Sequence, residues 1–204
     1  MVVNYHYIYT SNANNNVVDI TGDFTVAAAG ATFKNGFGVQ FPSSSNLVRE
    51  VLGQKITSSY ITRSANGLEA SQSKAVIIPF DDHSALTRNT TDSVFVNTEN
   101  DRSKVMGDTA HVLIKFLTPQ PPATIGLAPF NPFLISNQRR RHEIHLPGDV
   151  PTDKADTKLF GTLADKSNPQ IISSYYKTDF NWPWAMSFNE RFNYPLELQS
   201  IDKA

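Results

Sequence analysis

The chain of 204 residues carries 18 Lys and Arg against 19 Asp and Glu, so its net charge of −1 creates no global attraction to nucleic acid or to an anionic membrane. It contains no cysteine, which excludes disulfides, thiolate nucleophiles and cysteine-ligated zinc. Charged residues are 18% of the chain, below the average of about 25%, which favours an extracellular β-sandwich over a cytosolic helical enzyme. No apolar run approaches the ~20 residues of a membrane helix, so we expect no direct membrane insertion by this segment.

The chain opens directly on a strand pattern. From Val2 to Tyr9 both alternating sets of side chains include apolar residues, which predicts a strand that is central or buried on both faces. Native N-termini seldom begin inside a strand. We therefore expect residues 1–204 to be a single β-sandwich domain excised from a longer exported protein.

The second strand shows a clean alternation. Val18, Ile20, Phe24 and Val26 alternate with polar residues, which is typical of a strand with one face on a core and one in water. The asparagine-rich turn at 11–16 lies between the two strands and predicts an antiparallel hairpin.

A glycine-containing strand follows over 36–41. Gly36 and Gly38 lack side chains, so a ring or another backbone can pack closely against them. The polar run at 43–46 is typical of a helix cap, so we expect a short helix over Leu47–Leu52. Asn66-Gly67 predicts a tight hairpin turn.

The second half adds more short strands. Ala75–Phe80 is continuously apolar, as in a sandwich core, and His111–Leu117 alternates. Apolar residues flank a basic tip, Arg139–Arg141, which predicts a β-hairpin with a solvated turn. Further strands are expected at 56–62, 94–96 and 194–201.

These elements define the expected fold. Ten to twelve short strands with turn signals between them predict an all-β protein, an antiparallel, jelly-roll-like β-sandwich with at most one or two short helices.

An aspartate-rich loop follows the predicted hairpin. Asp149, Asp153 and Asp156 offer the oxygen ligands that calcium prefers, which makes calcium a candidate cofactor. The spacing matches no EF-hand, and aspartates also begin turns by bonding their own backbone. Residues 152–156 equally suit the cap of a short helical turn, so both interpretations stay open.

Acidic and histidine residues suggest a second candidate site. Glu143 and His145 share one face of a strand, whereas His142 points to the other. A glycan-active hydrolase needs two carboxyl groups about 5 to 10 Å apart. The only nominees for such a pair are Glu143 and either Asp81 or Asp82. A solvated strand pair explains these residues more simply. Because the chain has no nucleophile elbow, P-loop or dinucleotide fingerprint, we expect no enzymatic activity.

The segment 175–184 is rich in aromatic residues. Aromatic faces stack on sugar rings and adjacent amides bond hydroxyls, which predicts a glycan-binding platform. The alternative is that these large rings plug the open end of a sandwich. The candidate ligand-binding residues are Tyr175, Tyr176, Trp182, Trp184, Asn181 and Asp179.

Several short blocks of sequence resemble the LruC domain, a family also described as a domain of unknown function in Bacteroides surface proteins. The resemblance implies export and association with the outer membrane of Gram-negative bacteria, with an acidic segment upstream of this start. It implies no activity and no catalytic residue. The blocks are Ala29–Gly38, Ala75–Asp81, Ala128–Phe133, Glu143–Gly148, Pro151–Asp156, Tyr175–Thr178 and Trp184-Ala185.

We therefore expect a non-catalytic cell-surface domain that binds a glycan or another surface macromolecule, such as a surface protein. The alternative from another class is a structural spacer or adhesin-like domain with no small ligand. A glycan-active hydrolase is the third hypothesis. Burial of Trp182 and Trp184 would favour the spacer, because a platform must be exposed.

Overall fold

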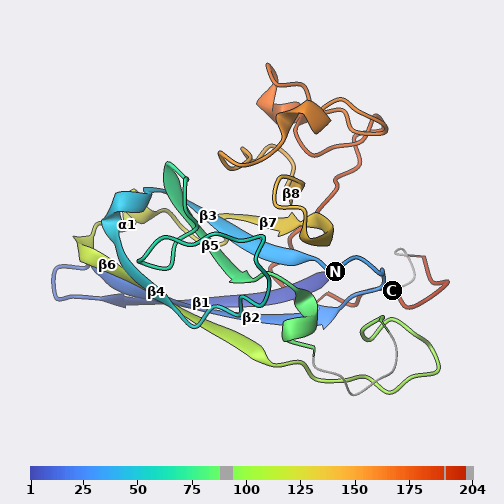
Figure 1. Cartoon of the computed structure of the whole chain (residues 1–204), viewed down its shortest axis with the longest axis horizontal. Coiled ribbons are helices and arrows are strands. Elements are labelled where there is room, and N and C mark those ends of the chain that lie inside the picture. The colour runs from blue at the N-terminus through green and yellow to red at the C-terminus, as the bar shows by residue number, and fades with distance from the viewer. Residues whose placement is uncertain (88–93, 191, 201–204) are drawn as a thin grey trace.

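The computed structural model describes residues 1–87, 94–190 and 192–200, and in them two four-stranded antiparallel sheets enclose a common core (Figure 1). The all-β antiparallel sandwich predicted from the sequence is confirmed. The first sheet has the order β1 (Val2–Ser11), β2 (Val17–Ala28), β6 (Thr109–Gln120) and β4 (Val48–Leu52). The second has the order β5 (Lys74–Phe80), β3 (Gly36–Ser44), β7 (Asn131–Ile135) and β8 (Glu143–His145).

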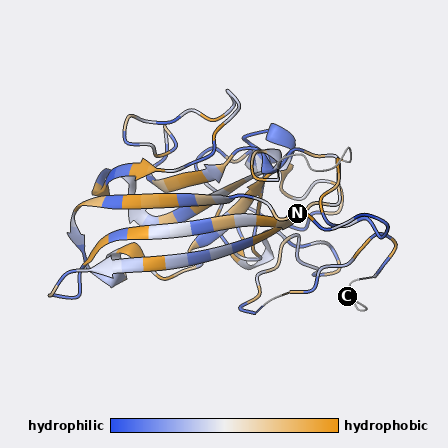
Figure 2. Ribbon diagram, turned by 90° about the horizontal axis from the view of Figure 1, so that it is seen from below, coloured by the Kyte–Doolittle hydropathy of each residue, from blue (hydrophilic) through white to orange (hydrophobic). Residues whose placement is uncertain are grey.

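The predicted hairpin of β1 and β2 is present, with Tyr5 opposite Phe24. Figure 2 shows hydropathy alternating along the strands, because one face of each meets the core. Two details differ from the prediction. A register shift before Asp19 turns Val17 inward and leaves Val18 exposed. β1 is an edge strand with one half-buried face and not a central strand.

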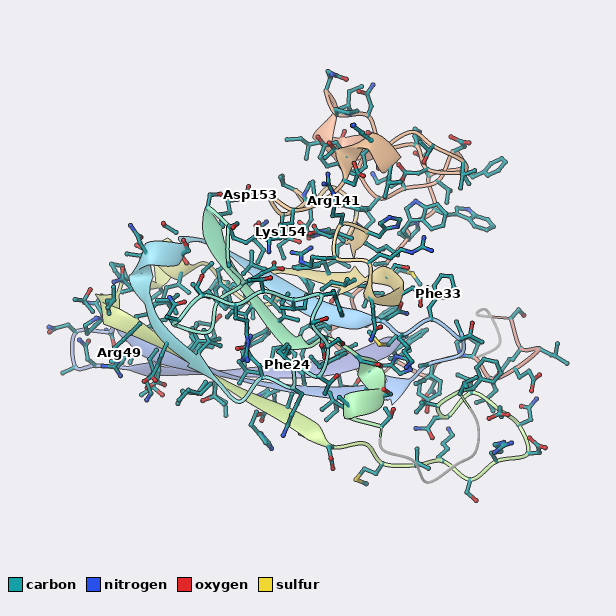
Figure 3. The ribbon with its side chains drawn as sticks, in the orientation of Figure 1. Phe24, Phe33, Arg49, Arg141, Asp153 and Lys154 are labelled. Carbon is teal, nitrogen blue, oxygen red and sulfur yellow. The ribbon has the colours of Figure 1, made fainter. Side chains whose placement is uncertain are left out.

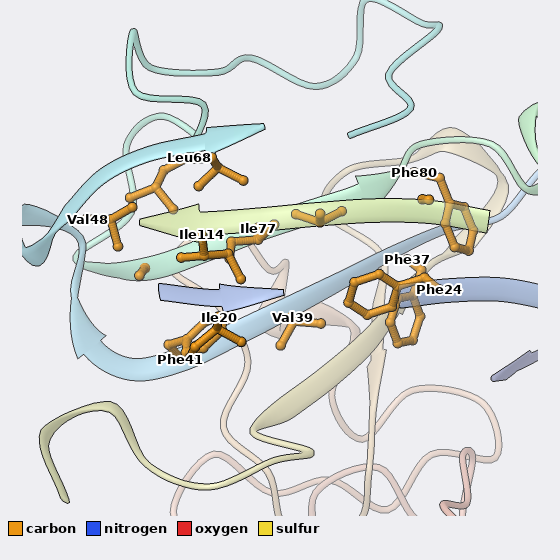
Figure 4. Close-up of a cluster of buried hydrophobic side chains, with 14 of the residues drawn as sticks. Ile20, Phe24, Phe37, Val39, Phe41, Val48, Leu68, Ile77, Phe80 and Ile114 are labelled. Atoms are coloured by element: carbon orange, nitrogen blue, oxygen red, sulfur yellow. The ribbon is translucent and has the colours of Figure 1, made fainter. Parts of the chain in front are cut away.

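The core is built from alternate residues of β2, β3 and β6 and from β5, which is buried from Ala75 to Phe80. β6 lies between β2 and β4 and points Val112, Ile114 and Phe116 inward, as predicted. Figure 4 shows these layers meeting through side chains that include Ile20, Phe24, Phe37, Val39, Phe41, Val48, Leu68, Ile77, Phe80 and Ile114.

The helix expected over Leu47–Leu52 is wrong. A 3-10 turn at Ser45–Leu47 leads directly into β4, and Val48 and Val51 pair with β6. A five-residue apolar pattern suits either element, and pairing with a neighbouring strand decides the outcome. The only α-helix among the described residues is α1 (Pro122–Ile125).

Three other expected strands are not part of either sheet. Residues 56–62 form a loop, although the tight turn predicted at Asn66-Gly67 is present. Val96 forms a single bridge with Ala29, and residues 194–200 are irregular, with residue 201 outside the described part. The described residues therefore hold eight strands, fewer than predicted.

β7 and β8 form the predicted hairpin, and the chain then leaves the sheets. Residues 146–186, here called the C-terminal lobe, form turns and isolated bridges beyond β8 (Figure 1). Across the described ranges, none of the helices has the length and apolarity needed to span a membrane.

Candidate functional site

The aromatic segment forms a tight hairpin at the surface of the C-terminal lobe. The Thr178 amide donates to the Trp182 carbonyl at 2.8 Å, and the Trp184 amide donates to the Tyr176 carbonyl at 3.0 Å. The Trp182 amide also donates to Thr178 Oγ1 at 3.1 Å. Asn181 has a φ of 63°, the left-handed region that asparagine tolerates. We call residues 176–184 the aromatic hairpin.

The hairpin presents apolar rings to solvent. Phe180 is 83% exposed, Trp182 72% and Trp184 44%. The indole N–H of Trp184 donates to Asp165 Oδ1 at 3.0 Å, which holds that ring in place. Asp179 precedes Phe180 in the sequence, Asn181 lies between Phe180 and Trp182, and both residues are exposed. Asn181 Oδ1 accepts a hydrogen bond from Lys166 Nζ at 2.7 Å.

The two tyrosines are not part of an exposed platform, which corrects the prediction for them. Tyr175 is 8% exposed and Tyr176 4%. The Tyr176 ring packs on His145 at 4.9 Å and edge-on against Phe160 at 5.5 Å. The Tyr175 hydroxyl donates to the Pro169 carbonyl at 2.9 Å. They are core residues that join the lobe to β8, the alternative raised from the sequence.

Each of the three candidate calcium ligands has a different local environment. Asp153 accepts a hydrogen bond from the Ser73 amide at 2.6 Å, which lowers the pKa of its carboxyl group. Asp156 accepts from the Lys158 amide at 3.2 Å and lies 3.8 Å from Arg141. Burial raises the pKa of Asp149.

Within the described ranges, no group of three or more acidic, histidine or cysteine side chains is arranged to hold a metal ion. Asp149, Asp153 and Asp156 would have to move to share calcium, so the calcium site stays a prediction. The melting midpoint in excess chelator against millimolar calcium tests it, because an ion that binds only the folded state raises that midpoint.

A buried polar cluster holds the lobe against the sandwich, and the sequence pattern did not reveal it. Arg140 was expected in a solvated turn with Arg139 and Arg141, but its side chain is buried. Its guanidinium donates to both oxygens of Glu69 and to Glu143. The cluster consists of Glu69, Gln72, Arg140, Glu143, His145 and Thr152.

Glu143 is the centre of this cluster. His145 Nε2 lies 2.8 Å from Glu143 Oε2, and the Thr152 amide donates to the same oxygen at 2.9 Å. The other imidazole nitrogen contacts Asn131 Oδ1. Burial alone would raise the pKa of Glu143, but the contacts with His145 and Arg140 outweigh it and lower that pKa to about 2.

Acid is therefore expected to weaken the fold through Glu143. Its folded-state pKa lies below the ordinary 4.5, so the stabilisation is complete above pH 4.5 and is lost as the pH falls toward 2. Urea unfolding at pH 6, 4 and 3 measures this loss. Glu143→Gln should make the curve flatter over that range, and an unchanged slope would contradict the assignment.

The remaining nominees for an acid–base site are also structural. Asp81 is buried and accepts hydrogen bonds from the amides of Thr57 and Ser58 at 2.9 and 2.6 Å. Asp82 accepts from the Ser84 amide at 2.9 Å. These carboxylates bond to backbone, and Glu143 belongs to the separate cluster above. The structure does not bring them together across an open cleft.

An apolar cavity of about 330 Å³ lies behind the aromatic hairpin. Its walls come from the start of β1, from β3, β7 and β8, and from residues 183–188, 190 and 192. Trp184 belongs both to these walls and to the aromatic hairpin. The Tyr5 hydroxyl bonds Ser187 Oγ at 2.7 Å beside it. The cavity has room for an apolar group larger than a single side chain.

The comparisons with known proteins identify a family and no individual relative. The family model described as "Domain of unknown function (DUF4842)" matches residues 15–204. No curated protein and no solved structure matches the chain. The match covers every element from the end of the first turn onward, including the aromatic hairpin and the buried polar cluster.

Proposed function

The chain belongs to the DUF4842 family, and we propose that it is a non-catalytic cell-surface domain whose aromatic hairpin binds a glycan or another surface macromolecule. One observation carries this proposal. Phe180 and Trp182 are largely exposed on a turn whose backbone is held by its own hydrogen bonds. Large exposed aromatic rings are unfavourable in water, and they commonly mark a binding surface.

The chemistry of the hairpin suits a sugar. A rigid aromatic face offers contact area at a small cost in side-chain entropy. Asp179 supplies acceptors for hydroxyl groups, and Asn181, held by Lys166, offers amide donors beside the rings. The nearby cavity behind Trp184 would accommodate an apolar substituent of a larger ligand.

The other hypotheses fit the geometry less well. A spacer domain is favoured by burial of the aromatic segment, and only the tyrosines are buried while Trp182 is not. A hydrolase needs two carboxyl groups facing a cleft, and Asp81, Asp82 and Glu143 are buried in hydrogen bonds.

We further propose that the family corresponds to the LruC domain, on the sequence blocks that resemble it. The protein would then be extracellular, held at the outer membrane through its parent chain, as in Bacteroides-type Gram-negative bacteria. Cell fractionation with antibody accessibility on intact cells tests this location. Exclusive recovery from the cytoplasm would contradict it.

Replacement of Trp182 by alanine is expected to abolish glycan-array binding and leave the melting temperature nearly unchanged. A millimolar complex is worth only about −4 kcal/mol, so the loss of one stacking ring removes measurable binding. An exposed side chain contributes within about 0.5 kcal/mol to stability.

Met106→Ala is the control, since Met106 is a fully exposed apolar side chain outside the C-terminal lobe. The glycan-array binding of Met106→Ala should equal that of the parent chain. Unchanged glycan binding by Trp182→Ala would contradict the proposal that the aromatic hairpin is the binding platform. A loss of about 3 kcal/mol or more in stability would instead assign Trp182 to packing.

A further inference from the structure

The buried polar cluster places a hydroxyl nucleophile beside a side-chain amide. Thr152 and Gln72 are both buried, and Gln72 Nε2 lies 3.2 Å from Thr152 Oγ1. The amide carbon is one bond from that nitrogen. Gln72 precedes β5 and Thr152 follows β8, so the contact joins the sandwich to the C-terminal lobe. Figure 3 shows the neighbours Asp153 and Lys154 at this boundary.

The hydroxyl of Thr152 has a base and charge stabilisation around it. It donates to the carboxylate of Glu143, and Glu143 is held in turn by His145. The oxygen also accepts from Arg140 Nη2 and from the Lys154 amide, each at 3.2 Å. An oxygen that loses its proton to Glu143 therefore meets a guanidinium and a backbone N–H.

The amide of Gln72 is held in one orientation. Its carbonyl oxygen accepts from the Asp153 amide at 3.1 Å, in the position of a donor that stabilises an oxyanion. Its nitrogen donates to Glu69 Oε2 at 2.8 Å. The groups that acyl transfer requires therefore lie around the Gln72 amide: a hydroxyl nucleophile, a carboxylate base, an imidazole beside that base and an N–H donor on the amide oxygen.

We propose that Thr152 and Gln72 form an intramolecular ester bond in the folded protein. Thr152 Oγ1 bonds to the side-chain carbonyl carbon of Gln72, and its proton passes to the Glu143 carboxylate. The bond from that carbon to the Gln72 nitrogen then breaks. The nitrogen takes the proton from Glu143 and leaves as ammonia, so one hydroxyl and one amide give one ester and one ammonia.

The bond would tie the loop before β5 to the loop after β8 and fix the C-terminal lobe on the sandwich. Thr152 and Gln72 are only 5% and 9% exposed, so bulk water would reach the ester slowly. A chain without cysteine would thereby gain a covalent cross-link of its own.

Peptide mapping of the full chain, purified folded and then denatured, tests the proposal. Trypsin releases Gln72 in peptide 64–74 and Thr152 in peptide 142–154. We expect these two peptides joined, with a mass lower by one ammonia than their sum. Mild alkali should separate them and leave glutamate at position 72. Asn66-Gly67 can also lose ammonia by cyclising, but that product leaves the peptides separate.

Two variants provide the controls. Thr152→Ser keeps the hydroxyl and should give joined peptides, whereas Thr152→Val should give only separate ones. Separate peptides from the folded parent chain would overturn the proposal, whether or not Thr152→Val folds. A link that resists alkali, or one that survives in Thr152→Val, would overturn it as well.

Discussion

Replacement of Arg140 by methionine should lower the free energy of unfolding by about 3 to 5 kcal/mol, the usual cost of leaving a buried charge without its partner. The Arg140 guanidinium donates to Glu69 and Glu143, and both carboxylates are buried. It also lies 5.4 Å from the centre of the Phe133 ring. Methionine preserves much of the packing volume but removes every donor.

Arg141→Met is the matched control for this experiment. Arg141 is the next residue, its side chain is 68% exposed, and its ion pair with Asp156 is 3.8 Å long. Exposed ion pairs of this kind contribute about 0 to 1 kcal/mol. Urea unfolding at neutral pH compares the two variants. Equal losses would contradict the role assigned to the buried polar cluster.

Gly38→Ala should destabilise the fold by about 1 to 3 kcal/mol or more, because the added methyl group has no space. A Cβ built at Gly38 would lie 2.2 Å from the Phe133 ring, which is buried between β3 and β8 residues. Phe133 also stacks on His145 at 4.8 Å, so the ring cannot move away without disturbing the buried polar cluster.

A double variant and a second glycine give this prediction its controls. Combining Gly38→Ala with Phe133→Leu should cost less than the sum of the two single changes, by about 0.5 kcal/mol or more, since both act on one contact. At Gly30 a Cβ would lie 3.3 Å from Thr98 side-chain atoms, a milder contact, so Gly30→Ala should cost less than Gly38→Ala. Thermal or urea unfolding measures the parent chain, the three single variants and the double variant. A cost in the double variant equal to the sum of the two single costs would contradict the contact.

The two largest effects concern one region, the boundary where β7 and β8 meet the C-terminal lobe. Phe133, His145 and Tyr176 form a stack across it, and the Arg140 ion pairs lie alongside. The aromatic hairpin begins at Tyr176, so its position depends on that stack. Variants of the buried polar cluster should therefore be checked for folding before any change in ligand binding is interpreted.

Local sequence patterns were sufficient to predict which side chains are buried where a strand has one face against the core. The alternation in β6, and that in β2 from Ile20 onward, predicted the inward residues, and the continuous apolar run of β5 predicted its burial. The tight packing against Gly38 was also predictable, because a glycine inside a strand leaves room for a ring. These signals are local, since side chains alternate along every strand with a period of two.

Short patterns were insufficient where two elements fit the same residues. Val48–Leu52 is as short as one helical turn and a half, and pairing with β6 made it β4. In the same way, β1 carries apolar residues on both faces, yet its place at the sheet edge leaves one of these two faces exposed to water. Neighbours from distant parts of the chain decide both cases.

By itself the sequence determined the all-β class, the β1–β2 and β7–β8 hairpins and the aromatic segment as a place of interest. Only the tertiary structure separated Trp182, which is exposed, from Tyr175 and Tyr176, which are buried. It also separated Arg140 from its two arginine neighbours, because Glu69 comes from 71 residues earlier in the chain. Burial and charge pairing depend on residues that are far apart in the sequence and meet only in the folded chain. The local alternation of apolar and polar residues therefore does not predict which of several identical side chains will have a buried partner.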